Sequence, residues 1–457
     1  MWESLLNLTI IADNRIHNYF TPISDAESWI LNDQKRDNNN YLLKQLWKSK
    51  TSGNYELSLM WYLMTRLCYK TVTTGLESVM NLVNQRWDII IIDPVFSPCS
   101  VVLQTLAQKP FILYSTSFLY PHSLRAQAVP IPLAITPQAN FADYEHSRFS
   151  DRLTEFLYWT VNHEIFRYIG DLYLDYTLSE HAGRRISINY ESSSIMMFDA
   201  VPSSLVESAP LSPTYKRLGN NKCSRNTTEI LPVDLELFIN DTSSKGTIVA
   251  AFGHMTNFQD ALPNVVPALL GAFQRLTQYR IIWQYRGPKL PDNAHIKITS
   301  WLPQKSLLQH NQSKVFITHV GMKSLLEGIC AEIPIIAMPL YAEQFGNARM
   351  FVKRHSLGGY LDKFTMTANS TYDTVVNVLL KYNFHHKNVG KAANLMEDTI
   401  QSGLTEAVFW TEFSIRNGQH MEIIQLKSKE VGWIKYFSGE LLIFLFIFGV
   451  VIKFLTY

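Results

Sequence analysis

Short apolar runs alternate with longer helical patterns in two parts of the chain. In the first part, continuous apolar runs at Trp87–Asp93 and Phe111–Thr116 are separated by one helix-length segment. Such runs are typical of strands that are buried on both faces of a parallel sheet. The pattern therefore predicts a βαβ unit in the first half of the chain.

A second and longer series of apolar runs begins after residue 245. It predicts strands at 246–253, 279–285, 295–298, 314–319 and 333–339, with a helix at 265–276 after the first of them. This alternation is typical of a doubly wound α/β domain. The polar stretch 218–245 between the two series predicts an interdomain linker. We place the two domains at residues 1–235 and 245–405.

The two chain ends differ in pattern. Residues 433–457 contain an unbroken apolar run at 441–452 with aromatic residues at its edges, which predicts a transmembrane anchor. A buried core helix is the alternative. The N-terminus has no basic start and its apolar stretch is interrupted, so no signal peptide is predicted. Residues 8–12 predict a buried strand instead.

Two cues for the placement of the chain body disagree. Lys427, Lys429 and Lys435 precede the apolar run and only Lys453 follows it, which puts the body in the cytosol by the positive-inside rule. N-glycosylation triplets favour a lumenal body. They begin at Asn7, Asn226, Asn240, Asn311 and Asn369.

Composition excludes several classes of protein. The 457 residues carry 41 Lys+Arg and 39 Asp+Glu, a net charge of +2 with no basic block, which argues against a dedicated nucleic-acid binder. Charged residues at 18% and hydrophobic ones at 47% exclude global disorder. The scattered cysteines exclude a disulfide scaffold and a CxxC zinc site; they are Cys68, Cys99, Cys223 and Cys330. No metal site is predicted.

Candidate chemistry lies after the predicted strands of the second domain, because open parallel sheets bind ligands beyond the carboxyl ends of their strands. His319 ends one strand, and the helix that follows presents unpaired N–H groups that suit a phosphate. Lys323 and Ser324 add side-chain donors there, and Glu327 lies one turn further. Glu343 and Gln344 follow the next strand.

Two further positions suit a nucleoside. Trp301 lies in a loop, where its ring can stack on a base, and Gln304 can bond a ribose. Gly253 ends the first strand of the series and gives a tight turn. Each of these residues alone is more typical of ordinary packing, and the order and spacing of the set favour a site.

The segment from Trp301 to Met350 resembles the signature of the UDP-glycosyltransferases, the UDP-glucuronosyltransferase family. The family pattern reads W-x-P-Q, then F-I-T-H-G-G-x-N-S-x-x-E, then P-x-x-x-x-P-L-F-x-D-Q-x-x-N. The segments WDIIIIDPVFSPCS, GTIVAAFGHMT and GLTEAVFWTEFSIRNGQHM also resemble family segments. The resemblance covers the chain from about residue 8 to its end, and it is closest to the animal membrane-bound branch.

The resemblance implies a GT-B architecture, an α/β fold with two Rossmann-like domains facing a cleft. The first domain would bind a small lipophilic acceptor and the second a UDP-sugar. Residues 406–430 would form a helix that crosses back before the membrane anchor. The implied roles are stacking on uracil for Trp301, ribose binding for Gln304 and Glu327, diphosphate contact for His319, and sugar contact for Glu343 and Gln344. Gly253, His254, Gly321, Lys323 and Ser324 complete the implied site.

The family's reaction transfers glucuronic acid or glucose with inversion: a histidine near the N-terminus deprotonates the acceptor and an aspartate orients it. That aspartate maps onto Asp93 rather than Asp88, because Asp93 ends its strand. Residues 7–13 resemble the family's second strand, so we expect an N-terminally truncated chain that lacks the histidine segment. A non-catalytic UDP-sugar-binding or partner-modulating pseudoenzyme is the alternative.

Several positions depart from the family pattern. Val320 stands at a glycine position, Lys323 at an asparagine, His254 at a serine and Glu343 at an aspartate, which indicates altered donor preference or relaxed constraint. The resemblance implies no cofactor and no metal, and association with copies of itself or related transferases. It implies an endoplasmic reticulum membrane protein with a lumenal body if a signal peptide precedes, and a tail-anchored protein otherwise.

Overall fold

The structure is a computed structural model. It describes residues 85–93, 107–116, 144–159, 193–206, 211–220, 231–253, 256–426 and 439–455, together with 47–49 and some single positions. The strand predicted at residues 8–12 and most of the first domain's helical connections lie outside the described residues.

The first sheet has four parallel strands in the order β1-β2-β3-β4. They are β1 (Ile90–Ile92), β2 (Phe111–Ser115), β3 (Met196–Asp199) and β4 (Tyr215–Arg217). The first two are the strands of the predicted βαβ unit. The last two were not predicted, because runs of four and three residues are too short to show a pattern. Helix α7 (Phe149–Trp159) also belongs to this half of the chain.

The second sheet has six parallel strands in the order β10-β9-β8-β5-β6-β7. They are β5 (Thr247–Ala251), β6 (Arg280–Gln284), β7 (Ile296–Thr299), β8 (Ser313–Thr318), β9 (Ile335–Ala337) and β10 (Gly358–Tyr360). The first five are the predicted strands. Strand order reverses between β5 and β8, the switch point at which open α/β sheets bind ligands.

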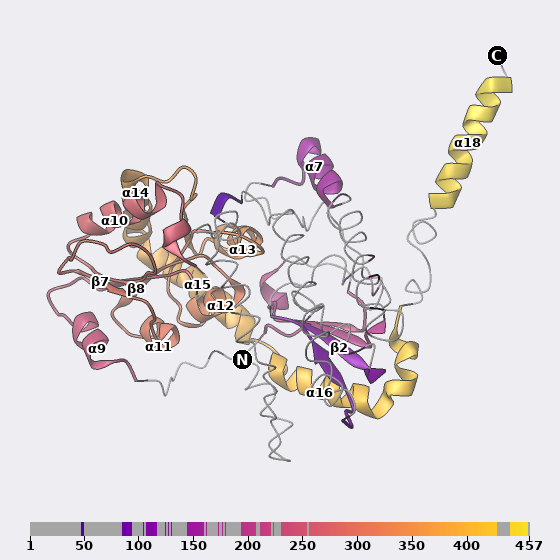
Figure 1. Cartoon of the computed structure of the whole chain (residues 1–457), viewed down its shortest axis with the longest axis horizontal. Helices are drawn as coiled ribbons and strands as arrows, with labels where there is room; N and C mark the ends of the chain where they lie inside the picture. The colour runs from indigo at the N-terminus through magenta and orange to yellow at the C-terminus, as the bar shows by residue number, and fades with distance from the viewer. Residues whose placement is uncertain are drawn as a thin grey trace.

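Helices cover both faces of this second sheet (Figure 1). They are α9 (Val233–Ile239), α10 (Val265–Arg275), α11 (Gln304–Leu308), α12 (Met322–Cys330), α14 (Ala368–Leu380) and α15 (Tyr382–Glu397). Shorter pieces are η3 (Ser203–Leu205), η4 (Phe258–Asp260), α13 (Gln344–Asn347), the π-helix η5 (Ala348–Lys353) and η6 (Gly418–Ile424).

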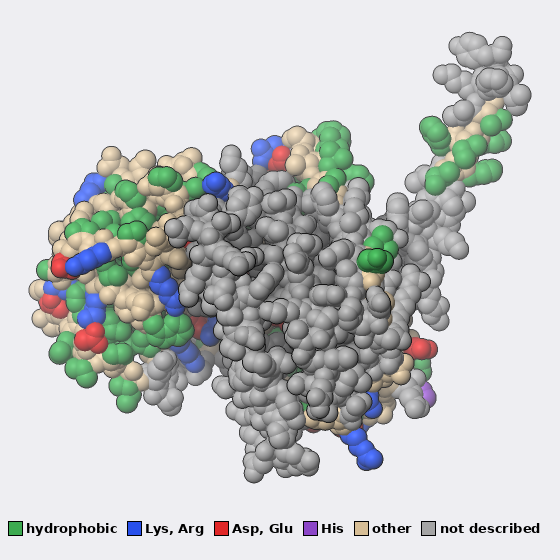
Figure 2. All heavy atoms as spheres, viewed as in Figure 1, with side chains coloured by type: hydrophobic (Ala, Val, Ile, Leu, Met, Phe, Trp, Pro, Cys, Tyr) green, Lys and Arg blue, Asp and Glu red, His purple; other side chains and the backbone are tan. Residues whose placement is uncertain are grey.

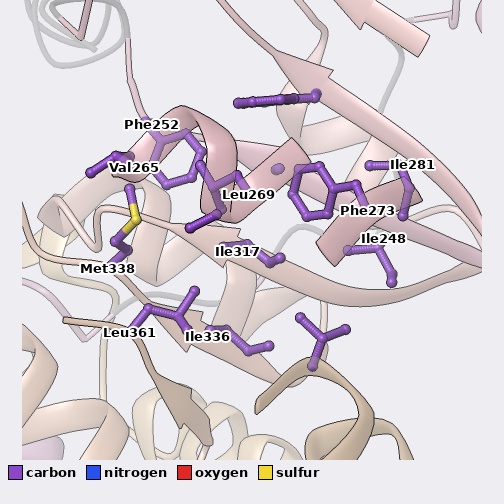
Figure 3. Packing of buried hydrophobic residues seen from close by; sticks show 14 of the residues in the cluster. Ile248, Phe252, Val265, Leu269, Phe273, Ile281, Ile317, Ile336, Met338 and Leu361 are labelled. Atoms are coloured by element: carbon purple, nitrogen blue, oxygen red, sulfur yellow. The ribbon is translucent and has the colours of Figure 1, made fainter. Parts of the chain in front are cut away.

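The largest apolar core lies between the second sheet and helices α10 and α14 (Figure 3). Helix α10 buries Val265, Ala268, Leu269, Ala272 and Phe273, whose three- and four-residue spacing gives it one apolar stripe. That stripe meets strand residues such as Ile248 and Trp283, which are fully buried. The helical pattern in the sequence and the buried strands thus complement each other.

The stretch predicted to be a linker contains helix α9. Leu235 and Ile239 of this helix are buried against Val249 and Phe316 of the second sheet. The polar residues around the helix hide it, because only one face of so short a helix is apolar. The connection between the two sheets is therefore shorter than the sequence indicated.

Helix α16 (Gly403–Asn417) returns the chain to the first sheet (Figure 1). Ala407 is buried with Ile112 and Met196, and Trp410 packs on the same cluster. The helix therefore connects the second sheet to the first, within the part of the chain where the crossing segment 406–430 was expected.

Replacing Gly403 with Ala is expected to lower the free energy of unfolding by about 2–3 kcal/mol, the upper part of the range for overpacking. The Gly403 N–H donates to the Asn220 carbonyl at 2.8 Å, and a Cβ there would lie 1.7 Å from the Leu218 carbonyl oxygen. Gly418→Ala is the matched control at the other end of α16, where a Cβ would meet nothing within 4 Å. Denaturant unfolding of the two variants measures the difference, and equal stabilities would contradict it.

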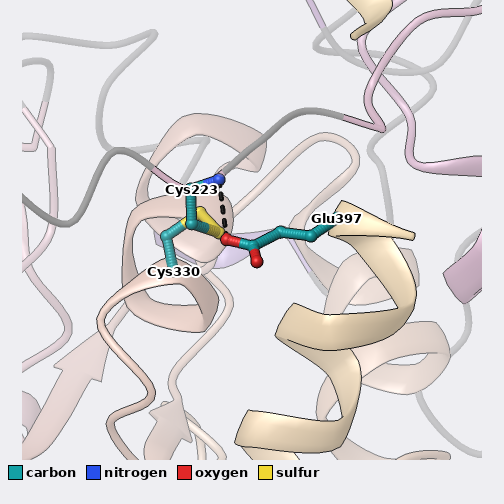
Figure 4. The surroundings of a disulfide bond; sticks show 3 residues. All are labelled: Cys223, Cys330 and Glu397. Atoms are coloured by element: carbon teal, nitrogen blue, oxygen red, sulfur yellow. Dashed lines mark hydrogen bonds between the residues drawn. A yellow bond between two sulfur atoms is a disulfide. The ribbon is translucent and has the colours of Figure 1, made fainter. Parts of the chain in front are cut away.

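One disulfide joins the two halves of the described chain (Figure 4). It links Cys223, which follows the first sheet, to Cys330 at the end of α12, across a sequence separation of 107 residues. The Cys223 N–H also donates to Glu397 Oε1 at 2.9 Å, at the end of α15. This cross-link was not predicted, and Cys68 and Cys99 lie outside the described residues.

The C-terminal helix α18 (Gly439–Leu455) projects from the rest of the chain and exposes apolar side chains, among them Ile443, Phe444 and Phe446 (Figures 1 and 2). Within the described ranges, no helix is long and apolar enough to cross a membrane. The transmembrane anchor predicted at 433–457 is not found there.

Candidate functional site

The predicted site residues of the second domain gather at the carboxyl ends of its strands. Gly253 follows β5, Trp301 follows β7, His319 follows β8 and Glu343 follows β9. All four strands are parallel, so these ends lie at one edge of the sheet. The switch point between β5 and β8 lies within this edge.

The imidazole of His319 lies between two glycine turns. A Cβ on Gly253 would come within 3.0 Å of its Nε2, and a Cβ on Gly321 within 2.7 Å. Gly253 has a φ of +79°, which disfavours a larger residue there. Thr318 Oγ1 lies 3.3 Å from His319 Nδ1. The two glycines therefore give the ring its space, and Thr318 contacts the nitrogen on its other side.

Val320 holds a left-handed conformation, with a φ of +56°, and its side chain is fully buried. A β-branched residue pays a steric cost in this conformation. The Asn347 Nδ2 amide donates to the Val320 carbonyl at 2.9 Å and so holds the turn from the end of α13. Sequence reasoning missed Asn347, although it is the last residue of the quoted signature pattern.

Gln304, Ser324 and Glu327 form one hydrogen-bonded cluster. Gln304 Nε2 donates to Glu327 Oε2 at 2.6 Å and to Ser324 Oγ at 3.1 Å. Lys323 Nζ lies 4.0 Å from Glu327 Oε1, and the lysine side chain is 69% exposed. The cluster brings together the start of α11 and the first two turns of α12, and its carboxylate and amide suit a pair of vicinal hydroxyls.

Trp301 presents its ring to solvent at this edge, with 64% of the residue exposed. Its backbone is fixed, because Thr299 Oγ1 donates to the Trp301 carbonyl at 2.6 Å. An exposed indole on a fixed backbone, three residues before Gln304, is a surface on which a planar base can stack.

The loop after β9 carries Glu343 and Gln344. The Glu343 carboxylate interacts with the backbone N–H of Met322, the first residue of α12, and burial raises the pKa of that carboxyl above its usual range. Gln344 is buried, and its Oε1 accepts from the N–H groups of Leu340 and Tyr341 at 2.9 and 3.1 Å. Glu343 thus faces the N-terminus of α12, where a phosphate is expected to bind. The side-chain oxygen of Gln344, in contrast, accepts hydrogen bonds from the backbone of its own loop.

Two of the predicted residues remain. His254 lies outside the described residues. Asp93 follows β1 in the first sheet. Burial, the charge of Asp199 and the charge of Asp93, in that order of size, raise the pKa of Tyr114 to about 12. Among the described residues no group of three or more His, Cys, Asp or Glu side chains suits a metal ion.

The chain matches known proteins over most of its length. A family model described as "UDP-glucoronosyl and UDP-glucosyl transferase" matches residues 12–457. A UDP-glucuronosyltransferase of Pleuronectes platessa is 26% identical over 387 residues, which are 81% of this chain and 77% of the relative. UDP-glucuronosyltransferase 1A1 of Homo sapiens is 24% identical over 386 residues, 83% of this chain and 70% of the relative.

Solved structures share the fold at low sequence identity. The glycotransferase of kitacinnamycin superposes with a TM-score of 0.55 at 15% identity, covering 78% of this chain and 82% of the other. A UDP-glucose: anthocyanidin 3-O-glucosyltransferase in complex with UDP gives 0.52 at 16% identity, covering 78% and 81%. These glycosyltransferase neighbours and the two parallel sheets confirm the predicted α/β GT-B fold. With the family model matching nearly the whole sequence, the chain belongs to the UDP-glucuronosyl and UDP-glucosyl transferase family of enzymes.

Proposed function

We propose that this chain transfers glucuronic acid or glucose from a UDP-sugar to the hydroxyl group of a small lipophilic acceptor, with inversion. The observation that carries the proposal is the cluster at the carboxyl edge of the second sheet. There an exposed indole, the hydrogen-bonded pair Gln304 and Glu327 and the start of α12 lie at the carboxyl ends of the strands, which supports a site for a base, a ribose and a diphosphate.

Each part of the cluster has one task in this proposal. Trp301 stacks on uracil, and Gln304 and Glu327 bond the ribose hydroxyls. His319 and the N–H groups in the first turn of α12 bind the diphosphate, and Lys323 adds positive charge. Relatives of this fold are known in complex with UDP, among them a variant of Os79 from O. sativa, with a TM-score of 0.53 at 14% identity over 78% of this chain and 84% of the other.

The reaction is a single displacement. The acceptor oxygen attacks the anomeric carbon from the face opposite UDP, and its proton passes to a base. The bond from that carbon to the phosphate oxygen breaks, and UDP leaves with the electron pair. The start of α12 stabilises the charge on the departing UDP. Asp93 is the proposed orienting acid for a histidine base, and no comparison favours the non-catalytic alternative.

Trp301→Ala is expected to weaken UDP binding by roughly 10- to 100-fold, because the stacking of one base on an aromatic ring is worth about 1–3 kcal/mol. Isothermal titration of the full chain with UDP measures the effect. Phe409→Ala on α16, which also removes a half-exposed aromatic ring, is the control and is expected to bind UDP as the wild type does. If wild-type protein does not bind UDP, or if both variants bind equally, the proposed donor site is wrong.

The proposed compartment of the chain body is the lumen of the endoplasmic reticulum. The Cys223–Cys330 disulfide supports this placement, because disulfides persist in oxidising compartments and are rare in the cytosol. The three glycosylation triplets in the described residues begin at exposed asparagines, as glycosylation requires; they are Asn240, Asn311 and Asn369. Both observations oppose the cytosolic placement that the lysine distribution favoured.

A further inference from the structure

A buried lysine lies beneath the proposed sugar-facing loop. Lys363 is 1% exposed, and no other lysine in the described part of the chain is buried. Its Nζ donates to the carbonyl oxygen of Leu340, and the rings of Phe345 and Phe364 lie 5.6 and 5.1 Å from Nζ. Burying an ammonium group is costly unless such partners compensate it. An apolar side chain of similar length would fill this space at lower cost, so the charge calls for an explanation.

The backbone around Lys363 is held on both sides. Asp362 Oδ1 accepts from the Phe364 N–H at 2.9 Å, which forms a tight turn after β10. Asn264 Nδ2, just before α10, donates to the Lys363 carbonyl at 3.0 Å and to the Met366 carbonyl at 3.2 Å. The turn therefore fixes where the ammonium group lies.

The loop above Lys363 is organised around the peptide groups of Leu340. The Leu340 N–H donates to Gln344 Oε1, and its carbonyl accepts from Lys363. Tyr341 bonds both Gln344 and Thr256 through its side chain, and Ala342 has a left-handed φ of +52°. The next residue is Glu343, whose carboxylate interacts with the backbone N–H of Met322 at the start of α12. The placement of Glu343 therefore depends on a loop whose first residue is held by Lys363.

We infer that Lys363 is a positioning residue for the donor sugar: its buried ammonium group fixes the Leu340 carbonyl and so holds the loop 340–344 in the shape that receives the sugar. This inference rests on the proposed function, and it takes Glu343 on this loop as the residue that faces the donor sugar, the role that the family resemblance implies for it. The lysine is buried beneath the loop, so in this inference it acts on the sugar through the loop and not by direct contact. Leu340, Leu361 and Met366 are all buried there.

Lys363→Met in the full chain tests the inference. The KM for UDP-glucuronic acid is expected to rise about five- to tenfold, less than the full effect of one lost hydrogen bond to a charged group, because the lysine acts on the sugar only through the loop. The Kd for UDP is expected to stay within about twofold, because UDP has no sugar for the loop to hold. The amides of Leu340 and Tyr341 are expected to exchange hydrogen faster. The midpoint of thermal unfolding is expected to stay constant or rise, because an apolar residue replaces a buried charge.

Lys353→Met is the matched control. Lys353 is exposed beside β10, with its Nζ 4.4 Å from the ring centroid of Tyr360, so its loss changes the net charge equally without touching the loop. The inference would be overturned if Lys363→Met had the wild-type KM and the wild-type exchange rates in the loop. It would also be overturned if the Kd for UDP rose as much as the KM for UDP-glucuronic acid. If wild-type chain fails to bind UDP, the proposed function fails, whereas the exchange rates still report on the lysine and the loop. Should the Met variant not fold, Lys363→Gln carries the same comparison.

Discussion

Glu327→Gln is expected to lower kcat/KM for a UDP-sugar by on the order of 100-fold, while leaving the fold intact. In the proposed site, the carboxylate accepts hydrogen bonds from two ribose hydroxyls, and a hydrogen bond to a charged group is worth about 1.5–3 kcal/mol. The amide retains one acceptor oxygen and loses the charge. The loss corresponds to about 2.7 kcal/mol, two tenfold steps of 1.36 kcal/mol each.

The structure gives a reason for placing this effect on Glu327 rather than on its neighbours. Its side chain is only 18% exposed, and Gln304 Nε2 already orients Oε2 at 2.6 Å. A carboxylate held in this way loses little entropy when a ligand arrives. Because Gln304 and Glu327 are in contact, the effects of Gln304→Ala and Glu327→Gln are not expected to add.

Steady-state kinetics with a UDP-sugar, together with titration by UDP, measures the effect. Glu412→Gln is the control, since this exposed carboxylate pairs only at 3.3 Å with Arg416 on α16 and lies on the helix that packs on the first sheet. A Glu327→Gln enzyme with wild-type kcat/KM would remove the ribose role from this residue. A loss shared by Glu412→Gln would point to net charge instead.

The largest effect on stability is expected from the disulfide. Replacing Cys223 and Cys330 together with Ser should lower the free energy of unfolding by about 4 kcal/mol, because cross-linking a loop of roughly 100 residues restricts the unfolded chain by about that amount in the chain-entropy description. The bond also holds the connection between the sheets against the end of α12, the helix whose start forms the proposed diphosphate site.

Denaturant unfolding of the double variant and of the wild type in reductant gives two independent measures of this contribution. Both midpoints are expected to fall by the same amount, since both remove the same cross-link. Gly418→Ala is the control, because its added Cβ would meet nothing within 4 Å, and its midpoint shows how much the measurement varies between variants without a structural effect. Unchanged midpoints in both experiments would show that the cross-link contributes no stability.

The second domain was predictable from sequence because its strands are buried on both faces. Four of its six strands contain continuous apolar runs, β7 alternates as Ile-Lys-Ile-Thr, and α10 shows a stripe at helical spacing. The sixth, β10, reads Gly-Gly-Tyr and has no apolar run that could reveal it. Helix α9 was missed because polar residues surround its few buried positions. A hydropathy pattern reveals a strand or helix only when enough of its residues are buried. Short elements such as β10 and α9 have too few buried residues to produce such a pattern.

The family, the α/β class and the order of the candidate donor-site residues along the chain follow from the sequence alone. Which of these residues come into contact depends on the tertiary structure. Gln304 and Glu327 touch across 23 positions, Cys223 and Cys330 across 107, and Leu340 rests on a lysine 23 residues later. Such contacts depend on how strands and helices pack, whereas periodicity along a chain carries information only about neighbours within a few residues. The spacing of the residues therefore predicted that they lie at the carboxyl edge of the second sheet. The packing of strands and helices determines which hydrogen bonds they form there.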